Sequence, residues 1–173
     1  MKTYKINKRY VDSHGPRGQN KIIGIVIHCI SAIEVDKNDP YNIDKIFNIL
    51  KKHFVSSDYL IDREGHIFKL TPPKRYAYHS GISQMPTGEC VFMNNNEPCV
   101  NKITIGIELI GIISKDFTKA QYEACAWLSR KLVRKYPHIA RDHIVGHEHV
   151  APDRKQDPGP TFDWELFYNI VGL

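Results

Sequence analysis

The sequence lacks any run of about 18 apolar residues, so it predicts no membrane-spanning helix and no stable membrane insertion. Its start, MKTYKINKRY, has basic residues but no apolar segment of the kind found in secretory signal peptides. We therefore expect a cytoplasmic protein, with a periplasmic or secreted location as the alternative if a leader precedes this sequence. Without repeats or low-complexity tracts, residues 1–173 are expected to form one domain, with 1–20 as an irregular leading arm.

Paired cysteine motifs are also absent. None of Cys29, Cys90, Cys99 and Cys125 belongs to a CxxC pair, which argues against a cysteine zinc knuckle. We expect all four thiols to be reduced, because disulfides are rare in proteins that are not exported. A bond between Cys90 and Cys99 in an oxidising compartment stays open as the alternative.

The charge balance is only mildly one-sided, with 24 Lys and Arg against 19 Asp and Glu and a formal net charge of +5. This excess favours an anionic partner, such as nucleic acid, a cell-wall polymer or a membrane surface, without choosing among them. No clustered basic stripe or run of stacking aromatics supports nucleic-acid binding, so we expect no such partner and a metal-dependent nuclease is the weaker alternative. The overall composition is that of a globular protein.

Short β-branched runs alternate with amphipathic stretches along the chain. The helix expected at 117–137 has Thr118 as its N-cap, with Gln121 in capping-box position and Pro137 at its end. Two further helices are predicted at 41–54 and 162–171. Strands are predicted at 21–30, at 58–70 as a pair around an Arg-Glu-Gly turn, at 103–109 and at 143–147. This alternation predicts an α/β domain with a central mixed β-sheet flanked by helices.

Polar side chains occur where the predicted strands end. His28 follows IIGIVI, Glu108 lies inside ITIGIEL, and His147 follows IVG. Two histidines and a carboxylate would supply three metal ligands and leave a fourth tetrahedral position open, as in catalytic zinc sites. Lys155 and Asp157 follow in APDRKQDPGP, a loop whose prolines and glycine would hold its side chains stiffly.

Simpler interpretations exist for most of these residues. A histidine such as His28 after an apolar strand is commonly a hydrogen-bonded core residue, and Lys155 and Asp157 could form a solvated surface pair. Glu108 is harder to explain in this way, because a buried carboxylate without a partner is costly.

Two other histidines lie close to His147 in the sequence. His143 has the i, i+4 spacing of a helical metal site, but HIVGH reads as a strand, so we expect His143 to point away from the target of His147. His149 competes with His147 as a ligand on chemistry alone.

The sequence resembles a known family, the zinc-dependent N-acetylmuramoyl-L-alanine amidases of the AmpD type, which are related to peptidoglycan recognition proteins. The last of six matching segments is very specific. In order, the segments are IVIHCIS (25–31), VSSDYLIDREG (55–65), AYHSGISQ (77–84), NKITIGIELIG (101–111), TKAQYEACAWL (118–128) and VGHEHVAPDRKQDPGPTFDW (145–164).

The resemblance implies a role for each residue of the polar group. His28, His147 and Asp157 match the family's zinc ligands, so Zn²⁺ is the implied cofactor. Glu108 matches the general base, and Lys155 matches the lysine that stabilises the oxyanion.

The resemblance also bears on the substrate. His79 and Asn101 match positions near the substrate cleft, whereas His149 falls where the family has no ligand. The implied reaction is hydrolysis of the amide between N-acetylmuramic acid and L-alanine in peptidoglycan or muropeptides. We expect soluble anhydro-muropeptides of cell-wall recycling as substrates. A lytic amidase acting on intact cell wall and a non-catalytic peptidoglycan-binding module are the alternatives.

The sequence departs from the family pattern at three places. Asp58 stands where relatives often carry histidine, and Phe54 where AmpD proteins carry an arginine that could meet substrate carboxylates. The span from His79 to Glu108 is longer than in those proteins, and the added residues within 85–99 are polar and turn-rich. This insertion is either a tolerated surface loop or a determinant of substrate specificity.

Overall fold

The computed structural model describes residues 2–89 and 99–172. In chain order its elements are β1 (Ile6–Lys8), β2 (His14–Pro16), β3 (Gly24–Ile30), α1 (Ile43–Lys52), β4 (Tyr59–Ile61), β5 (Ile67–Lys69), β6 (Arg75–Ala77), α2 (Cys99–Ile103), β7 (Thr104–Ile110), α3 (Lys119–Lys135), a 3₁₀ turn (Arg141–His143), β8 (Ile144–Gly146), α4 (His147–Val150) and α5 (Trp164–Val171).

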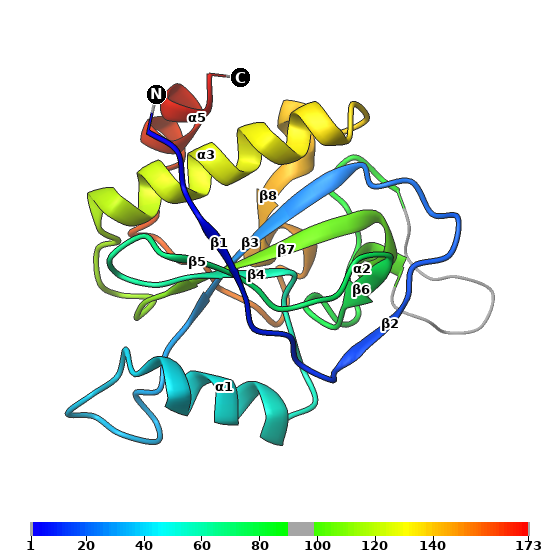
Figure 1. Ribbon diagram of the computed structural model, residues 1–173. Helices are drawn as coiled ribbons and strands as arrows, with labels where there is room; N and C mark the ends of the chain where they lie inside the picture. Colours follow the sequence, from blue (N-terminus) through cyan, green and yellow to red (C-terminus); the bar gives the residue numbers. More distant parts are fainter. Residues whose placement is uncertain (1, 90–98, 173) are drawn as a thin grey trace.

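A six-stranded sheet forms the centre of the protein, in the order β1-β5-β4-β7-β3-β8 (Figure 1). β3 runs parallel to both β7 and β8, and β4 runs parallel to β7 but antiparallel to β5. β2 and β6 form a separate antiparallel pair. The mixed sheet predicted from the sequence is confirmed.

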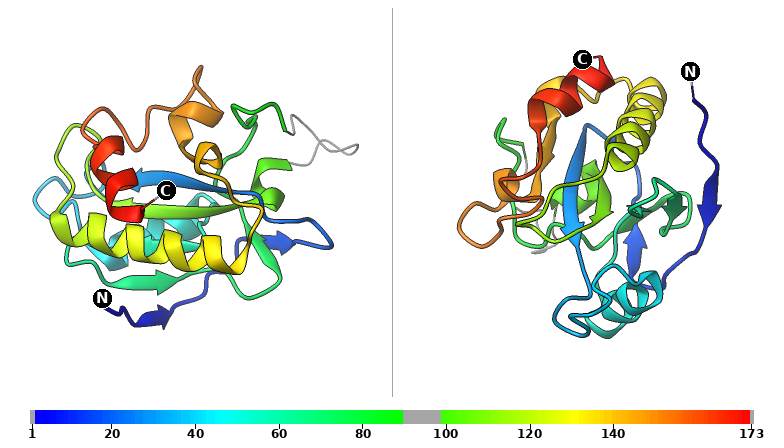
Figure 2. Two further views of the ribbon diagram at one scale, coloured as in Figure 1. Left: turned by 90° about the horizontal axis from the view of Figure 1, so that it is seen from above. Right: turned by 90° about the vertical axis from the view of Figure 1, so that its left-hand side faces the viewer.

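Helices cover both faces of the sheet (Figures 1 and 2). α3 and α5 pack on one face, where Ile27 of β3 and Ile107 of β7 belong to the main hydrophobic core. α1 lies on the opposite face, and its Leu50 belongs to a second core cluster with Leu60 of β4. Because side chains alternate along a strand, the residues between the core isoleucines of β3 and β7 face away from α3. That face carries the candidate active site.

The N-terminal cap of α3 follows the sequence prediction closely. Thr118 accepts a hydrogen bond from the backbone of Gln121, whose side chain accepts one from the backbone of Thr118, so the capping box is present.

The predicted strand at 143–147 is shorter than expected, because His147 already begins α4. The cause is local: the Nδ1 atom of His149 accepts the backbone N–H of Gly146 at 2.9 Å and caps that helix.

The leading arm is more regular than the sequence suggested, because β1 pairs with β5 and β2 with β6. Arg17, directly after β2, is 6% exposed and its guanidinium donates to the carbonyls of Lys102 and Thr104 at 2.6 and 2.9 Å. It also lies 3.4 Å from the carboxylate of Asp58, which accepts the backbone N–H of Gly106 at 3.0 Å. This buried pair joins the arm to α2 and β7.

We predict that Arg17→Met lowers the free energy of unfolding by about 3–5 kcal/mol, because it leaves the buried carboxylate of Asp58 without its cation. Urea unfolding monitored by circular dichroism measures the change. Lys119→Met is the control, since Lys119 forms an exposed ion pair with Glu123 whose loss should cost less than ~1 kcal/mol. Equal destabilisation by both substitutions would contradict a structural role for the buried pair.

The cysteines differ from the expectation of four reduced thiols. Cys29 and Cys125 are free, but Cys99 is disulfide-bonded. Spacing in the sequence could not decide this, because a disulfide depends on which thiols the fold brings together. Cys90 and most of the insertion within 85–99 lie outside the described residues.

Among the residues that the structure describes, no helix is both long enough and apolar enough to span a bilayer.

Candidate active site

The site begins with two neighbouring parallel strands. In the register of β3 and β7, His28 is directly paired with Glu108, and both lie on the face away from α3. The Oε2 atom of Glu108 is buried and has no hydrogen-bond partner among the described residues. Burial raises the pKa of Glu108 well above its usual range, the charge of Asp157 adds to this, and Lys155 opposes it. The strand pairing thus places a basic carboxylate beside a histidine.

Three ligand atoms converge beside Glu108. The Nδ1 atoms of His28 and His147 are 3.0 Å apart, and the Oδ2 atom of Asp157 lies 3.2 and 3.1 Å from them. The first lies within β3, the second is the first residue of α4, and the third lies in the loop before α5. Ligands at 2.0–2.1 Å around a tetrahedral zinc are about 3.3 Å apart, which is close to this triangle.

The protonation states of these groups suit a cation. The Nε2 atom of His147 lies 3.2 Å from the carbonyl oxygen of Ser80, which only accepts, so Nε2 carries the hydrogen and Nδ1 presents a lone pair. Lone pairs of Nδ1 and of the Asp157 carboxylate at 3.1 Å repel one another unless a cation lies between them. The donor set of two imidazole nitrogens and one carboxylate oxygen therefore fits zinc.

Burial also prepares the ligands electrostatically. It lowers the pKa of His28 to about 4, so the imidazole is neutral near neutral pH. Burial alone would raise the pKa of Asp157, but the close contacts with the His147 and His28 imidazoles outweigh it and hold this pKa well below its usual range. A neutral imidazole and an ionised carboxylate are the states that bind metal.

The loop that carries Asp157 is packed tightly against the rest of the protein. The backbone carbonyl of Asp157 accepts the N–H of Glu148 at 2.9 Å. Gly159 has φ = +100°, and a Cβ atom there would lie 2.6 Å from the carbonyl oxygen of Ile113. Only glycine fits this position, so the glycine of the DPGP motif allows the loop to approach closely enough to aim its carboxylate at the histidines.

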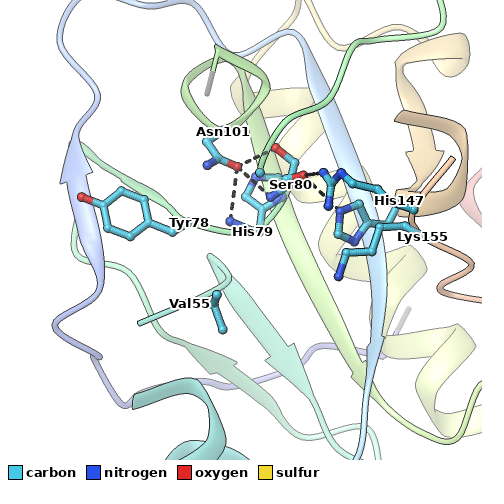
Figure 3. Close-up of a pocket in the computed structure, with 9 residues that line it drawn as sticks. Val55, Tyr78, His79, Ser80, Asn101, His147 and Lys155 are labelled. Carbon is cyan, nitrogen blue, oxygen red and sulfur yellow. Dashed lines mark hydrogen bonds between the residues drawn. The ribbon is translucent and has the colours of Figure 1, made fainter. Parts of the chain in front are cut away.

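A solvent-open cleft of about 230 Å³ reaches His147 of the ligand group (Figure 3). Lys155 lies in its wall and is close enough to lower the pKa of both His28 and Glu108. The residues lining the cleft are Val55, Tyr78, His79, Ser80, Gly81, Asn101, His147, Arg154 and Lys155.

The two predicted substrate residues, His79 and Asn101, line this cleft, but the hydrogen bonds that they form are internal (Figure 3). The Oδ1 atom of Asn101 accepts from the backbone N–H and hydroxyl of Ser80 at 2.8 and 2.6 Å and from the backbone N–H of His79 at 3.2 Å. The Nδ1 atom of His79 lies 3.0 Å from the Nε2 atom of His28. Their contact with substrate stays a prediction.

The other two histidines of the region lie outside the ligand group. The Nδ1 atom of His143 lies 2.9 Å from the carbonyl of Ile23, at the opposite end of β8 from His147, and its Nε2 atom contacts Glu89. His149 caps α4 through the backbone of Gly146.

Sequence reasoning missed the residues that hold the cleft wall together. The guanidinium of Arg154 donates to the carbonyl oxygens of Ser80 and Ile82, and the distance from Nε of Arg154 to the oxygen of Ile82 is 2.9 Å. These bonds connect the loop of Lys155 to the turn after β6. The motif around Arg154 was recognised, but nothing in it indicated which carbonyls the guanidinium would reach. Thr104, behind His79, was likewise not singled out.

Comparison with known proteins places these features in a family. Residues 18–160 match the family model described as N-acetylmuramoyl-L-alanine amidase. A 1,6-anhydro-N-acetylmuramyl-L-alanine amidase AmpD of Salmonella typhimurium (strain SL1344) is 42% identical over 119 residues, 69% of this chain. The matched stretch spans 58% of that relative's length.

Solved structures agree with the sequence matches. The crystal structure of an AmpD selenomethionine derivative superposes with a TM-score of 0.74 at 29% identity, covering 96% of this chain and 94% of the other. The complex of the Escherichia coli amidase AmiD with anhydro-N-acetylmuramic acid-L-Ala-D-γ-Glu-L-Lys superposes with a TM-score of 0.67 at 28% identity, covering 94% and 60%. The overall fold is shared with these amidases.

Proposed function

The chain belongs to the N-acetylmuramoyl-L-alanine amidase family, and on this premise we propose that it hydrolyses the amide between N-acetylmuramic acid and L-alanine. The observation that carries the proposal is the convergence of His28, His147 and Asp157 beside Glu108, whose Oε2 atom has no hydrogen-bond partner in the part of the chain that the structure describes. A non-catalytic binding module would have no use for a complete ligand set next to a buried base.

His28, His147 and Asp157 would hold a zinc ion. When bound, zinc supplies Lewis acidity, which polarises the scissile carbonyl and makes water nucleophilic near neutral pH.

Glu108 and Lys155 would act on the reacting atoms. Glu108 would take the proton of the attacking water and later deliver it to the L-alanine nitrogen as the carbon–nitrogen bond breaks. The raised pKa of Glu108 suits such a proton carrier. Lys155, on the cleft wall, would stabilise the negative charge that develops on the carbonyl oxygen.

We propose soluble 1,6-anhydro-muropeptides as the substrates, because the AmpD relatives are named for that substrate and the AmiD structure contains an anhydro-muropeptide. The cytoplasmic location stays a prediction. A specific observation favours the second candidate, an amidase acting on intact wall: the disulfide at Cys99 is typical of oxidising compartments.

Product analysis separates these candidates. Zinc-loaded protein is incubated with a soluble anhydro-muropeptide and, separately, with purified sacculi, and the released peptides are identified by mass spectrometry. We expect peptides with free N-terminal L-alanine from the soluble substrate, a higher kcat/KM on it than on sacculi, and no release with chelator. Faster release from sacculi would favour the wall-acting amidase, and no release from either would refute the amidase function.

We predict that Lys155→Ala lowers kcat on the muropeptide by about 10²–10³, by analogy with the loss of an oxyanion-hole donor. Steady-state kinetics with the zinc-loaded variant measures this, and zinc binding should persist because Lys155 is not a ligand. Lys115→Ala removes an exposed lysine outside the cleft and serves as the control. Equal kcat for the two variants would remove Lys155 from the mechanism.

A further inference from the structure

A chain of hydrogen bonds leads from His28 into the protein interior behind the cleft. The Nε2 atom of His28 lies 3.0 Å from Nδ1 of His79, and Nε2 of His79 lies 3.2 Å from the hydroxyl of Thr104. That hydroxyl lies 2.6 Å from the carbonyl oxygen of Val100. All four residues are buried, so water does not compete for these bonds.

The direction of every hydrogen bond in this chain follows from its last member. The carbonyl of Val100 can only accept, so the hydroxyl of Thr104 donates to it and accepts from Nε2–H of His79. A neutral His79 then has a bare Nδ1 atom, which accepts from Nε2–H of His28. The remaining nitrogen of His28, Nδ1, therefore presents its lone pair to His147 and Asp157.

The strand β7 is built to hold this chain in place. Thr104, Gly106 and Glu108 are alternate residues on one face of the strand, and the register pairs Glu108 with His28. A Cβ atom at Gly106 would lie 2.7 Å from Cγ of His79, so the glycine leaves room for the ring. One strand thus supplies the anchor for His79, the space for its ring and the proposed base.

We propose that His79 and Thr104 are positioning residues, which fix the tautomer and ring orientation of His28 for the metal. The inference rests on the proposed zinc site, and it gives His79 a different role from the substrate contact that the sequence suggested. Hydrogen bonds of this kind behind a metal-binding histidine typically change metal affinity 10–100-fold.

Thr104→Val tests the anchor with little change of shape. The valine cannot accept Nε2–H of His79, which stays buried without a partner, and we expect zinc to bind about 10–100-fold more weakly than in the wild type. Thr104→Ser keeps the hydroxyl and should retain wild-type affinity within a few-fold. The dissociation constant for Zn²⁺ is measured by competition with a chromophoric chelator.

A second pair of variants tests His79 itself. His79→Leu removes the acceptor for Nε2–H of His28, whereas His79→Asn can place an amide oxygen close to the former Nδ1 position. We expect the leucine variant to lose zinc affinity by the same factor and the asparagine variant to recover part of it. This pair also answers the question if Thr104→Val fails to fold.

Long-range ¹H–¹⁵N NMR of the histidine rings reports on the chain independently of metal affinity and activity. In the wild type we expect His79 to carry its hydrogen on Nε2, with and without Zn²⁺. His79 with its hydrogen on Nδ1 would overturn the proposal, as would equal zinc affinity of Thr104→Val and Thr104→Ser. Failure of the wild type to bind zinc or cleave muropeptide would refute the proposed function. The tautomer of His79 would still decide the direction of the hydrogen bonds from His28 to Val100.

Discussion

His147→Ala is expected to lower amide hydrolysis by about 10³–10⁴, since a catalytic metal contributes several kcal/mol and each 1.36 kcal/mol is a factor of ten in rate. The side chain supplies one corner of the ligand triangle, 3.0 Å from His28 and 3.1 Å from Asp157. Its loss leaves only two ligands. We expect stoichiometric zinc binding to disappear in the same variant, as measured by metal analysis after dialysis.

A neighbouring residue provides the matched control for this prediction. His149→Ala changes another histidine of α4, which caps the helix but does not face the ligand triangle. That variant should keep one zinc per chain and lose only some stability, about 1 kcal/mol for a lost helix cap. Added zinc should raise the melting temperature of the wild type and of His149→Ala, because a ligand that binds the folded state stabilises it, but not that of His147→Ala. Unchanged zinc affinity in His147→Ala would contradict the assigned ligand set.

Glu108→Gln is expected to lower kcat by about 10²–10⁴, the range that general acid–base catalysis contributes. The substitution keeps the shape of the side chain and the path of β7 but removes the group that accepts the proton. The variant should bind zinc as the wild type does, because Glu108 is not among the converging ligand atoms. Near wild-type turnover would show that another group is the base.

The stability of the same variant provides an independent check on the buried carboxylate. Its pKa in the folded protein is raised above the usual value of 4.5, so the folded state disfavours the charged form. Below pH 4.5 both folded and unfolded states are protonated, and this effect is absent. As the pH rises above 4.5, the metal-free wild type should lose stability relative to Glu108→Gln, until the folded-state pKa is passed. Parallel urea-unfolding series at pH 4 and pH 7 test this sign.

Local patterns determined much of this protein directly from the sequence. The capping box of Thr118 and Gln121 depends on residues three positions apart, and the β-branched runs that became β3 and β7 depend on short-range periodicity. Two histidines after apolar runs and the Pro-Gly loop also suggested a metal site, and the resemblance to the amidase family implied which residues serve as ligands. Such signals are local, so they survive without knowledge of the fold.

The partners of the buried polar groups were decided only by the tertiary structure. Arg17 reaches carbonyls more than eighty residues away, and nothing near it in the sequence indicates that it is buried. Asn101 and His79 were predicted to contact substrate because they match such positions in the family, yet the register of β7 and the turn after β6 direct their hydrogen bonds inward. Hydrogen bonds are short and directional, so strand register and side-chain burial select among donors and acceptors that a sequence pattern cannot tell apart.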